Sequence, residues 1–307
     1  MEARNCYEGV NSPFYKLPGI DELVRTLVRD GCLVLELMHI MTTDDRPFRT
    51  MSTKFSPTIY PINNTICRHI LLDLLAIKKQ IPLAFLQHLY EQLQYEDAPF
   101  ERMLDKFLDF HFMRTFEVQN LAGARHLLDA ARMKFLPMMV GQRDEAGSAL
   151  AACFSPHNFG EMSVRYSAID LEDSGVTIPL AAEGMMIWDP RLAWRPFLKL
   201  PRILINRDSD YIFRNMVAYG QRVVEDDDLQ PVSSYLRLLS DLLLTAADAR
   251  ALTSQGIIDN QLGSLEDVVD FFKDLKLGDT YGIDMLSKVR KDINTHSERE
   301  GISNGLI

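Results

Sequence analysis

The chain has 307 residues, of which 47% are hydrophobic and 25% are charged, and its formal net charge is −10. A chain of this length and composition can bury a hydrophobic core large enough to fold without disulfides or metal ions. Its Lys and Arg residues are spread along the chain, which argues against nucleic-acid binding, because proteins that bind phosphate backbones cluster their basic side chains.

We predict an N-terminal tail over residues 1–19 and a helical lobe over residues 20–139. After the turn at Pro18–Gly19, apolar residues recur near helical spacing up to Met38, although Gly31 is expected to weaken this helix. A helix capped within Asn63–Thr65 and a helix that starts at Pro82 should follow. The clearest apolar stripe comes next and contains Phe100, Met103, Leu104, Phe107, Leu108 and His111.

The composition changes over residues 140–162, where Gly, Ser and Ala are frequent, and we interpret this stretch as a linker or loop. A second lobe is predicted over residues 163–296. It begins with three short apolar segments bounded by Gly and Pro, a pattern typical of short strands: 175–180, 185–188 and 196–205. Helices follow, one of them with a capping box formed by Ser264 and Asp267, and a frayed tail is expected over residues 297–307.

These elements predict a mainly α-helical (α+β), bundle-like protein with a small antiparallel β element near residues 175–205. The first ten residues lack the apolar centre of a signal peptide, and the most apolar runs, 32–41 and 70–77, are too short to span a bilayer. The cysteines form no CxxC pair and are irregularly spaced, as expected of reduced thiols: Cys6, Cys32, Cys67 and Cys153. We therefore expect a soluble intracellular protein, located in the cytoplasm, that can associate with membranes through partners.

The sequence contains none of the usual local signatures of phosphate, hydrolase or zinc sites. GxxxxGK[ST], GxGxxG after a strand, GxSxG and HExxH are all absent, and no Cys/His spacing fits zinc. We accordingly assign no catalytic, cofactor-binding or metal-binding residue, and no cofactor. Many enzyme sites leave no local motif, so this absence alone does not exclude an enzyme.

Two His–acid pairs have helical spacing, namely His69 with Asp73 and His126 with Asp129. Each pair has two readings: half of a metal site or an acid/base pair, or a partly buried histidine satisfied by its neighbouring carboxylate. A site needs three or more converging ligands and the sequence offers no third, so the structural reading is favoured.

Three further patterns also favour structural readings. The acidic run Glu225–Asp228 lacks the alternating ligands and the turn-making glycine of a calcium loop, and a solvated loop is expected. Asn63–Thr65 fits the N-glycosylation pattern, but a helix cap is expected there. Trp188 and Trp194 would suit a partner interface if exposed, whereas burial in the core is favoured because of their large apolar area.

Several sequence blocks stand in a specific order over about residues 20–295. They are Asp30–Leu37, Asp73–Leu75 with Gln80–Pro82, His126–Asp129 with Phe135–Pro137, Ala168–Leu171 with Ser174–Val176, Leu200–Pro201 with Phe213–Tyr219, Ser234–Tyr235 and Gly256–Ile258. Each block is weak alone, but their order and spacing together resemble the plant family called domain of unknown function 247.

Most of these blocks have an architectural explanation. Gln80 is expected to satisfy loose backbone groups at a helix junction, and Arg214 with Asn215 to bridge the two lobes through polar contacts. The family's Glu-Asn before Gln-Ile-Pro is Lys78–Lys79 in this chain, and its later Glu is Gly220, so no role of either Glu carries over. The family's N-terminal block and its C-terminal segment, in many members a membrane-spanning helix, have no counterpart, which indicates a shortened or divergent member.

Three functions remain open at this point. The lack of site motifs, the long amphipathic chain and the resemblance favour a non-catalytic interaction or recognition protein with a protein partner; family members in grasses are implicated in pollen–stigma self-incompatibility. One alternative is an enzyme of unrecognised type with a site between the lobes, for which His126 and Asp129 are the first candidates. The other is a degenerate paralogue with little function.

Overall fold

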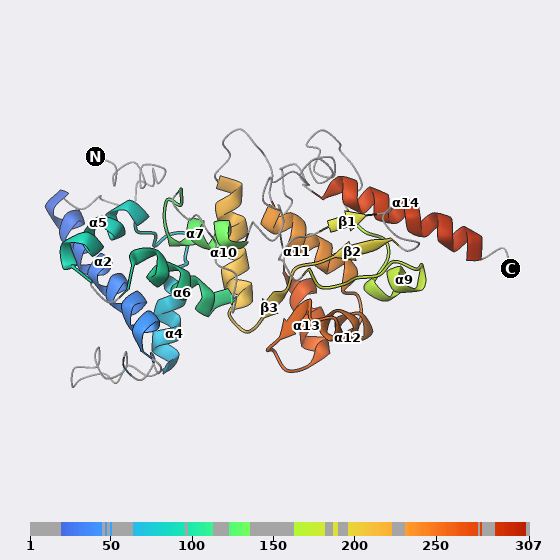
Figure 1. Cartoon of the computed structure of the whole chain (residues 1–307), viewed down its shortest axis with the longest axis horizontal. Coiled ribbons are helices and arrows are strands. Elements are labelled where there is room, and N and C mark those ends of the chain that lie inside the picture. The colour runs from blue at the N-terminus through green and yellow to red at the C-terminus, as the bar shows by residue number, and fades with distance from the viewer. Residues whose placement is uncertain are drawn as a thin grey trace. The chain divides into compact units, whose positions relative to one another are not determined.

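The computed structural model in Figure 1 describes residues 20–44, 47, 50, 64–95, 98–112, 123–135, 163–181, 187–189, 196–222, 231–275, 277 and 286–304. The chain divides into two compact units, Met1–Met133 and Lys134–Ile307. Each unit is described by itself. The predicted tail over residues 1–19 and the predicted linker over residues 140–162 lie outside the described residues.

The first unit is built from helices. They are α2 (Ile20–Thr43), α4 (Asn64–Asp73), α5 (Leu83–Leu93), α6 (Phe100–Phe112) and the start of α7 (Leu127–Phe135). The long helix α2, blue in Figure 1, packs against both α5 and α6. Its buried face includes Leu27, Val34, Leu35 and Met38, which repeat at the helical spacing that the sequence shows.

Helices α2 and α5 approach each other closely at Gly31. A Cβ atom at this position would lie 2.6 Å from Cδ1 of Leu89 and 3.4 Å from the ring of Phe85, both on α5. The sequence predicts that Gly31 weakens α2, yet the helix is continuous through it. The contacts with α5 compensate for the low helix propensity of glycine, and a side chain at this position would displace the end of Leu89.

The second unit contains four short strands that pair two by two. Strand β1 (Ile187–Asp189) is antiparallel to β2 (Phe197–Lys199), and β3 (Ile203–Ile205) is parallel to β4 (Ile258–Asn260). The predicted small β element is thus present, but its antiparallel character holds only for β1 and β2. The prediction is wrong for β3: its partner follows a long helical crossover, the kind of connection that parallel pairing needs.

The segment predicted as a strand over residues 175–180 makes only isolated bridges, from Thr177 to Phe197 and from Leu180 to Leu200. Pro179 lacks the N–H that a regular ladder would use, which explains why the pairing is interrupted. The bridges still place this segment beside β2.

Helices precede, separate and follow these strands along the chain. They are α9 (Ala168–Asp173), α10 (Ser209–Arg222), α11 (Pro231–Leu242), α12 (Ala246–Ser254), α13 (Leu265–Asp274) and α14 (Ser287–Asn304). Helix α11 packs on α10 and α13, and α12 packs on α9, α13 and β4. The capping box predicted for Ser264 and Asp267 is confirmed, and Ser167 and Thr245 start α9 and α12 with the same motif.

The last helix continues beyond the point where the sequence predicts a tail. Helix α14, red in Figure 1, runs to Asn304 instead of ending near His296. Ser297 is buried, and Glu298 forms an ion pair with Arg165. The helix thus includes residues 297–304, where the sequence predicts a tail, and the ion pair of Glu298 attaches its first part to another segment of the unit.

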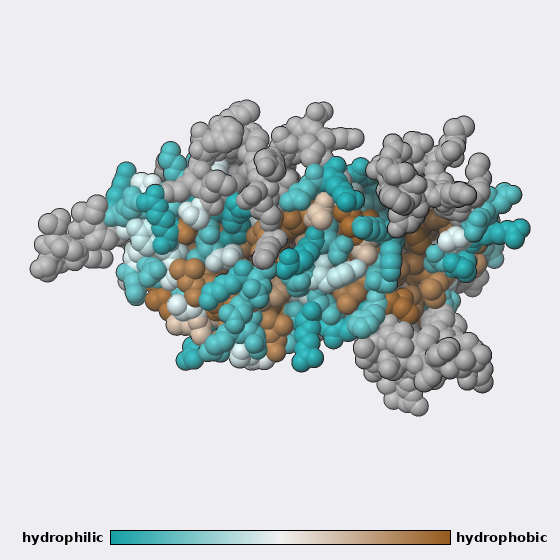
Figure 2. Space-filling view, turned by 180° about the vertical axis from the view of Figure 1, so that it is seen from behind, coloured by the Kyte–Doolittle hydropathy of each residue, from teal (hydrophilic) through white to brown (hydrophobic). Residues whose placement is uncertain are grey.

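The described part of the chain is mainly helical with a small β component, which confirms the predicted fold class. Figure 2 shows the molecule from the side opposite to Figure 1. On this side, hydrophilic residues cover much of the described surface, with smaller groups of hydrophobic residues between them. None of the helices within the described ranges is both long enough and apolar enough to cross a membrane.

Candidate functional site

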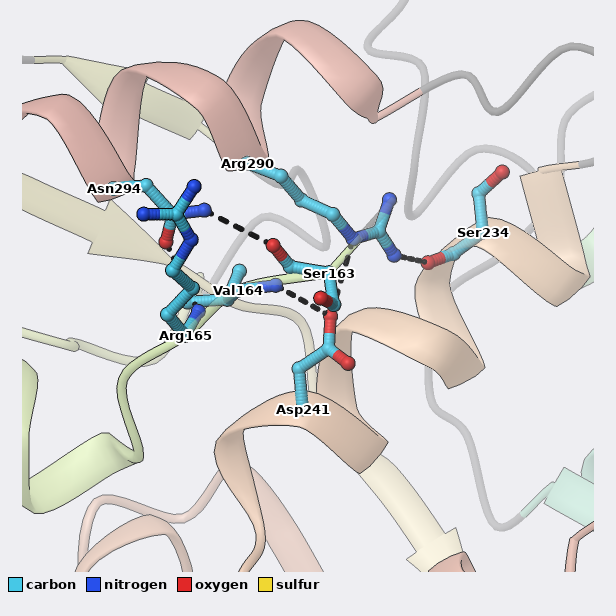
Figure 3. Close-up of polar contacts among 7 residues, drawn as sticks. All are labelled: Ser163, Val164, Arg165, Ser234, Asp241, Arg290 and Asn294. Atoms are coloured by element: carbon cyan, nitrogen blue, oxygen red, sulfur yellow. Dashed lines mark hydrogen bonds and ion pairs between the residues drawn. The ribbon is translucent and has the colours of Figure 1, made fainter. Parts of the chain in front are cut away.

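A non-helical segment of the second unit, Ser163–Arg165, is held by side chains of α11 and α14 (Figure 3). The amide of Asn294 makes two of the contacts: Oδ1 accepts from the N–H of Arg165 at 3.0 Å, and Nδ2 donates to the C=O of Ser163 at 3.0 Å. One side chain therefore satisfies a donor and an acceptor of the segment's backbone, and these two hydrogen bonds fix the segment against α14.

A buried ion pair supports the same segment. Oδ2 of Asp241, on α11, accepts from the N–H of Val164 at 2.8 Å and from Nε of Arg290 at 3.2 Å. Nη2 of Arg290 also donates to the C=O of Ser234 at 2.8 Å, and Arg290 is 0% exposed. A charge buried this completely requires a partner, so α11, α14 and the segment depend on one another.

Burial raises the pKa of Asp241 above its ordinary value, and this outweighs the lowering effects of the Val164 N–H and of the Arg290 guanidinium. The carboxyl group therefore lies in an environment from which water is largely excluded. In such surroundings the attraction between opposite charges is stronger than at the surface.

The side chains that hold the segment belong to a polar stripe on the buried face of α14. Arg290, Asn294 and Ser297 follow one another at i, i+4 and i+7, and all are at most 1% exposed. They lie beside buried apolar residues of this helix, Val289 and Ile293. The sequence gives no signal for this stripe, because polar residues at such spacing usually face solvent.

An open surface pocket of about 730 Å³ lies beside the held segment. Its lining comes from the segment, from α9 and its end, and from α14: Arg165, Tyr166, Asp170, Asp173, Ser174, Ser297 and Glu298. Arg165 crosses to Glu298, with 2.6 Å between Nη1 and Oε1. Three carboxylates and one guanidinium thus give the lining a negative balance.

His126 and Asp129 have structural contacts in the first unit, but these differ from the expected contact between the histidine ring and the neighbouring carboxylate. Nδ1 of His126 accepts from the N–H of Asp129 at 3.2 Å, and the Asp129 carboxylate accepts from the N–H of Arg125 at 2.9 Å. Together they cap the N-terminus of α7. Burial lowers the pKa of His126 to about 4, and the Arg125 charge adds to this against the opposing effect of Asp129. The imidazole is consequently neutral at pH 7, as a ring nitrogen that accepts a hydrogen bond must be.

The second His–acid pair is not brought together in this way. Asp73 forms an ion pair with Lys79, while His69 is exposed. Lys79 is one of the two lysines that stand where the resembled family has Glu-Asn. Lys79, which stands at the Asn of that pair, thus has a local partner, Asp73, at the end of α4.

The role predicted for Gln80 is confirmed. Its Nε2 donates to the C=O of Leu74 at 2.9 Å and of Ala76 at 2.7 Å, near the end of α4. Its Oε1 accepts from the N–H of Leu128, in the first turn of α7, at 2.9 Å. One side chain thus bonds carbonyls that follow the end of one helix and an N–H left free at the start of another.

Arg214 contacts two residues of the second unit, Asp210 and Asp274. Its Nε pairs with Asp210 one helical turn earlier at 2.6 Å, and its Nη2 donates to the C=O of Asp274 at the end of α13 at 2.9 Å. Asn215 donates to the C=O of Tyr211 in its own helix. Arg214 thus stabilises the end of a neighbouring helix, a role the sequence did not suggest.

Several candidates from the sequence lie outside the described residues. These are the acidic run Glu225–Asp228, Trp194, Asn63 and the side chain of Trp188. Among the side chains that the structure does describe, Cys32 is a free thiol, and no group of three or more His, Cys, Asp or Glu residues is arranged to hold a metal ion.

Comparisons with known proteins agree with the sequence blocks. A family model described as a plant protein of unknown function, DUF247, matches residues 1–304. The UPF0481 protein At3g47200 of Arabidopsis thaliana is 23% identical over 308 residues, which cover 91% of this chain but only 60% of that relative's length. No solved structure matches the chain significantly. The resemblance is confirmed: the chain belongs to the DUF247 family of plant proteins.

Proposed function

We propose that this chain is a non-catalytic recognition protein that binds a protein partner. The observation that supports the proposal best is the fixed support of the pocket beside segment 163–165. Asn294 and Asp241 hold the backbone of that segment from two helices. A binding surface that is rigid before its partner arrives loses less conformational entropy on binding, which favours affinity.

The histidine and aspartate residues that the sequence offers as catalytic candidates in the first unit form structural contacts, which supports the same proposal. His126 and Asp129 cap a helix. Nδ1 of His126 accepts a hydrogen bond from the N–H of Asp129, so this nitrogen is not available as a base. Asp73 is engaged by Lys79. An enzyme site built on these residues would have to break contacts that the fold uses.

The proposal includes a cytoplasmic location, as the composition suggests. A fluorescent fusion of the full chain in plant cells should give a diffuse cytoplasmic signal, with membrane signal only where a membrane-bound partner is co-expressed. A fusion confined to an organelle without any partner would contradict this part of the proposal.

The direct test of function is affinity purification of the tagged full chain from plant tissue, followed by mass spectrometry. We expect a reproducible protein partner that also recovers the chain in the reciprocal purification. Recovery of nothing above a tag-only control, from tissues where the chain is present, would contradict recognition and would favour a search for enzyme activity or a degenerate copy.

A further inference from the structure

The pocket lined by α9 and α14 carries a surplus of negative charge that the fold does not use. Asp173 is exposed at the end of α9, and it has no hydrogen-bond or ion-pair partner among the residues that the structure describes. One carboxylate oxygen of Asp170 accepts a hydrogen bond from the N–H of Ser167 at 2.9 Å. Glu298 is engaged by Arg165. A cation that enters the pocket thus meets Asp173 without having to displace a protein contact.

A second, independent feature of the lining is an unsatisfied hydroxyl. Ser297 is 1% exposed and lines the pocket, and within the described part of the chain its Oγ has no hydrogen-bond partner. Buried polar atoms in native proteins nearly always have a partner, so one that remains unpaired beside a pocket is a candidate hydrogen-bonding group for a ligand. The neighbouring hydroxyl of Ser174 is already used, since it donates to the C=O of Asp170 at 2.6 Å.

Tyr166 adds an aromatic ring to the same lining and is half-buried. Carboxylates, a hydroxyl acceptor and an aromatic ring are the groups that bind the side chains of arginine and lysine in proteins, through charge-assisted hydrogen bonds and cation–π contact. Arginine suits such a site better than lysine because its planar guanidinium can stack on the ring while it donates several hydrogen bonds.

The pocket is also held in shape before any ligand binds. Arg165 and Tyr166 follow directly on the backbone that Asn294 and Asp241 fix, and Ser297 lies on the same helix as Asn294. The fold already places a guanidinium at this site: Arg165 reaches Glu298 across the lining. A guanidinium from outside would find Asp173 and Asp170 still available.

We propose that this pocket binds an arginine or lysine side chain, with arginine preferred, that is presented by the protein partner. The inference rests on the proposed recognition function and adds the place and the chemistry of recognition. Asp173 supplies the main charge, Tyr166 the stacking surface and Ser297 a hydrogen-bond acceptor.

The test is a titration of the isotope-labelled full chain with the peptide Ac-Gly-Arg-Gly-NH2. Binding is detected by changes in the NMR chemical shifts of the backbone amides. The matched probe is the same peptide with neutral citrulline, which keeps the shape of arginine without its charge. We expect saturable shifts in residues 165–174 and 297–298, with a dissociation constant on the order of 1 mM, as suits a few kcal/mol from one side chain. The lysine peptide should bind more weakly, and citrulline should give no saturable shift there.

The variant D173N should weaken binding of the arginine peptide by about two- to fivefold, the range of one exposed ion pair. The matched control is D270N, which removes an exposed carboxylate of α13 that does not line the pocket. S297A should also weaken binding while its far-UV circular dichroism stays that of the wild type, because alanine is a good helix former.

Equal binding of the citrulline peptide, or equal losses in D173N and D270N, would overturn the assignment. The assignment would also be overturned if calcium chloride, but not the arginine peptide, changed the NMR amide shifts of the pocket residues. These outcomes leave the proposed function untouched, because partner capture from tissue is measured independently of the peptide. A partner captured equally well by wild type and D173N would overturn the pocket alone, whereas no captured partner would overturn the function.

Discussion

Arg290 and Asp241 form an ion pair in the interior of the second unit, with 3.2 Å between Nε and Oδ2. The guanidinium is 0% exposed, and the side chain of Asp241 is 14% exposed. Through the N–H of Val164 this pair also positions the segment that forms one wall of the pocket. The ion pair therefore connects the stability of the unit with the geometry of the proposed binding site.

Removal of either member of this pair should be costly, and the two losses should not add. We expect R290M to lower the free energy of unfolding by about 3–5 kcal/mol, because Asp241 is left as a buried charge without its counter-ion. D241N keeps an acceptor for Val164 but strands the guanidinium, with a loss of similar size. The double variant should lose clearly less than the sum of the single losses, as measured by urea unfolding. Simple additivity would show that the two side chains do not interact.

His126 should make the first unit sensitive to acid. Its pKa is about 4 in the folded chain, whereas an unfolded histidine titrates near 6.5, so the unfolded state binds the extra proton over this interval. Stability is consequently lost as the pH falls from about 6.5 to 4, by up to about 2 kcal/mol at pH 5.

The variant H126N separates this titration from the cap, because asparagine caps helices well and carries no proton in this range. We expect H126N to be close to the wild type at pH 7 and more stable than it at pH 5, in urea unfolding monitored at both values. H126A should lose about 1 kcal/mol already at pH 7 through loss of the cap. A stability difference between H126N and wild type that does not change with pH would contradict the pKa shift.

Gln80 should be one of the most sensitive polar positions of the first unit. Q80A removes three hydrogen bonds and leaves the N–H of Leu128 without its partner, so we expect a loss of about 2–3 kcal/mol in the free energy of unfolding. Q80E keeps an acceptor for Leu128 but places a negative charge beside two carbonyl oxygens, and it should be no better. The exposed Gln92 on α5 is the control: Q92A should change stability by less than about 0.5 kcal/mol.

Gly31 should tolerate alanine far better than a large side chain. In G31A the gain in helix propensity, about 1 kcal/mol, opposes the clash of the new Cβ with the mobile end of Leu89, so the net change should be small. G31L has no such space and should lose about 1–3 kcal/mol by overpacking. The change L89A should restore part of that loss, as thermal unfolding of the double variant would show. A G31L chain as stable as wild type would contradict the close approach of α2 and α5.

The sequence predicts well those features that depend on neighbouring residues. Apolar spacing identifies the amphipathic faces of α6, α11 and α13, and the Ser264–Asp267 pattern identifies a helix start. Gln80 could be interpreted because it stands at a proline-marked junction between two helices. The cap by His126 was harder to foresee, since histidine is not among the preferred N-cap residues.

Features that depend on distant residues could not be predicted in this way. Strand β4 has only three residues, too few for a periodic signal, and its pairing with β3 follows from the helices between them. Arg290 and Asn294 meet partners that are 49 and 131 residues away in the chain, and nothing local marks them as buried. The pocket was missed for the same reason, because its lining comes from residues 165–174 and 297–298.

The most direct measurement is quantitative affinity capture from plant tissue with three forms of the full chain: wild type, D173N and D270N. We expect wild type and D270N to recover the same partner in similar amounts, and D173N to recover about two- to fivefold less of it. A captured partner whose amount is the same for all three forms would contradict the pocket. No partner recovered by any form would contradict recognition as the function of this chain.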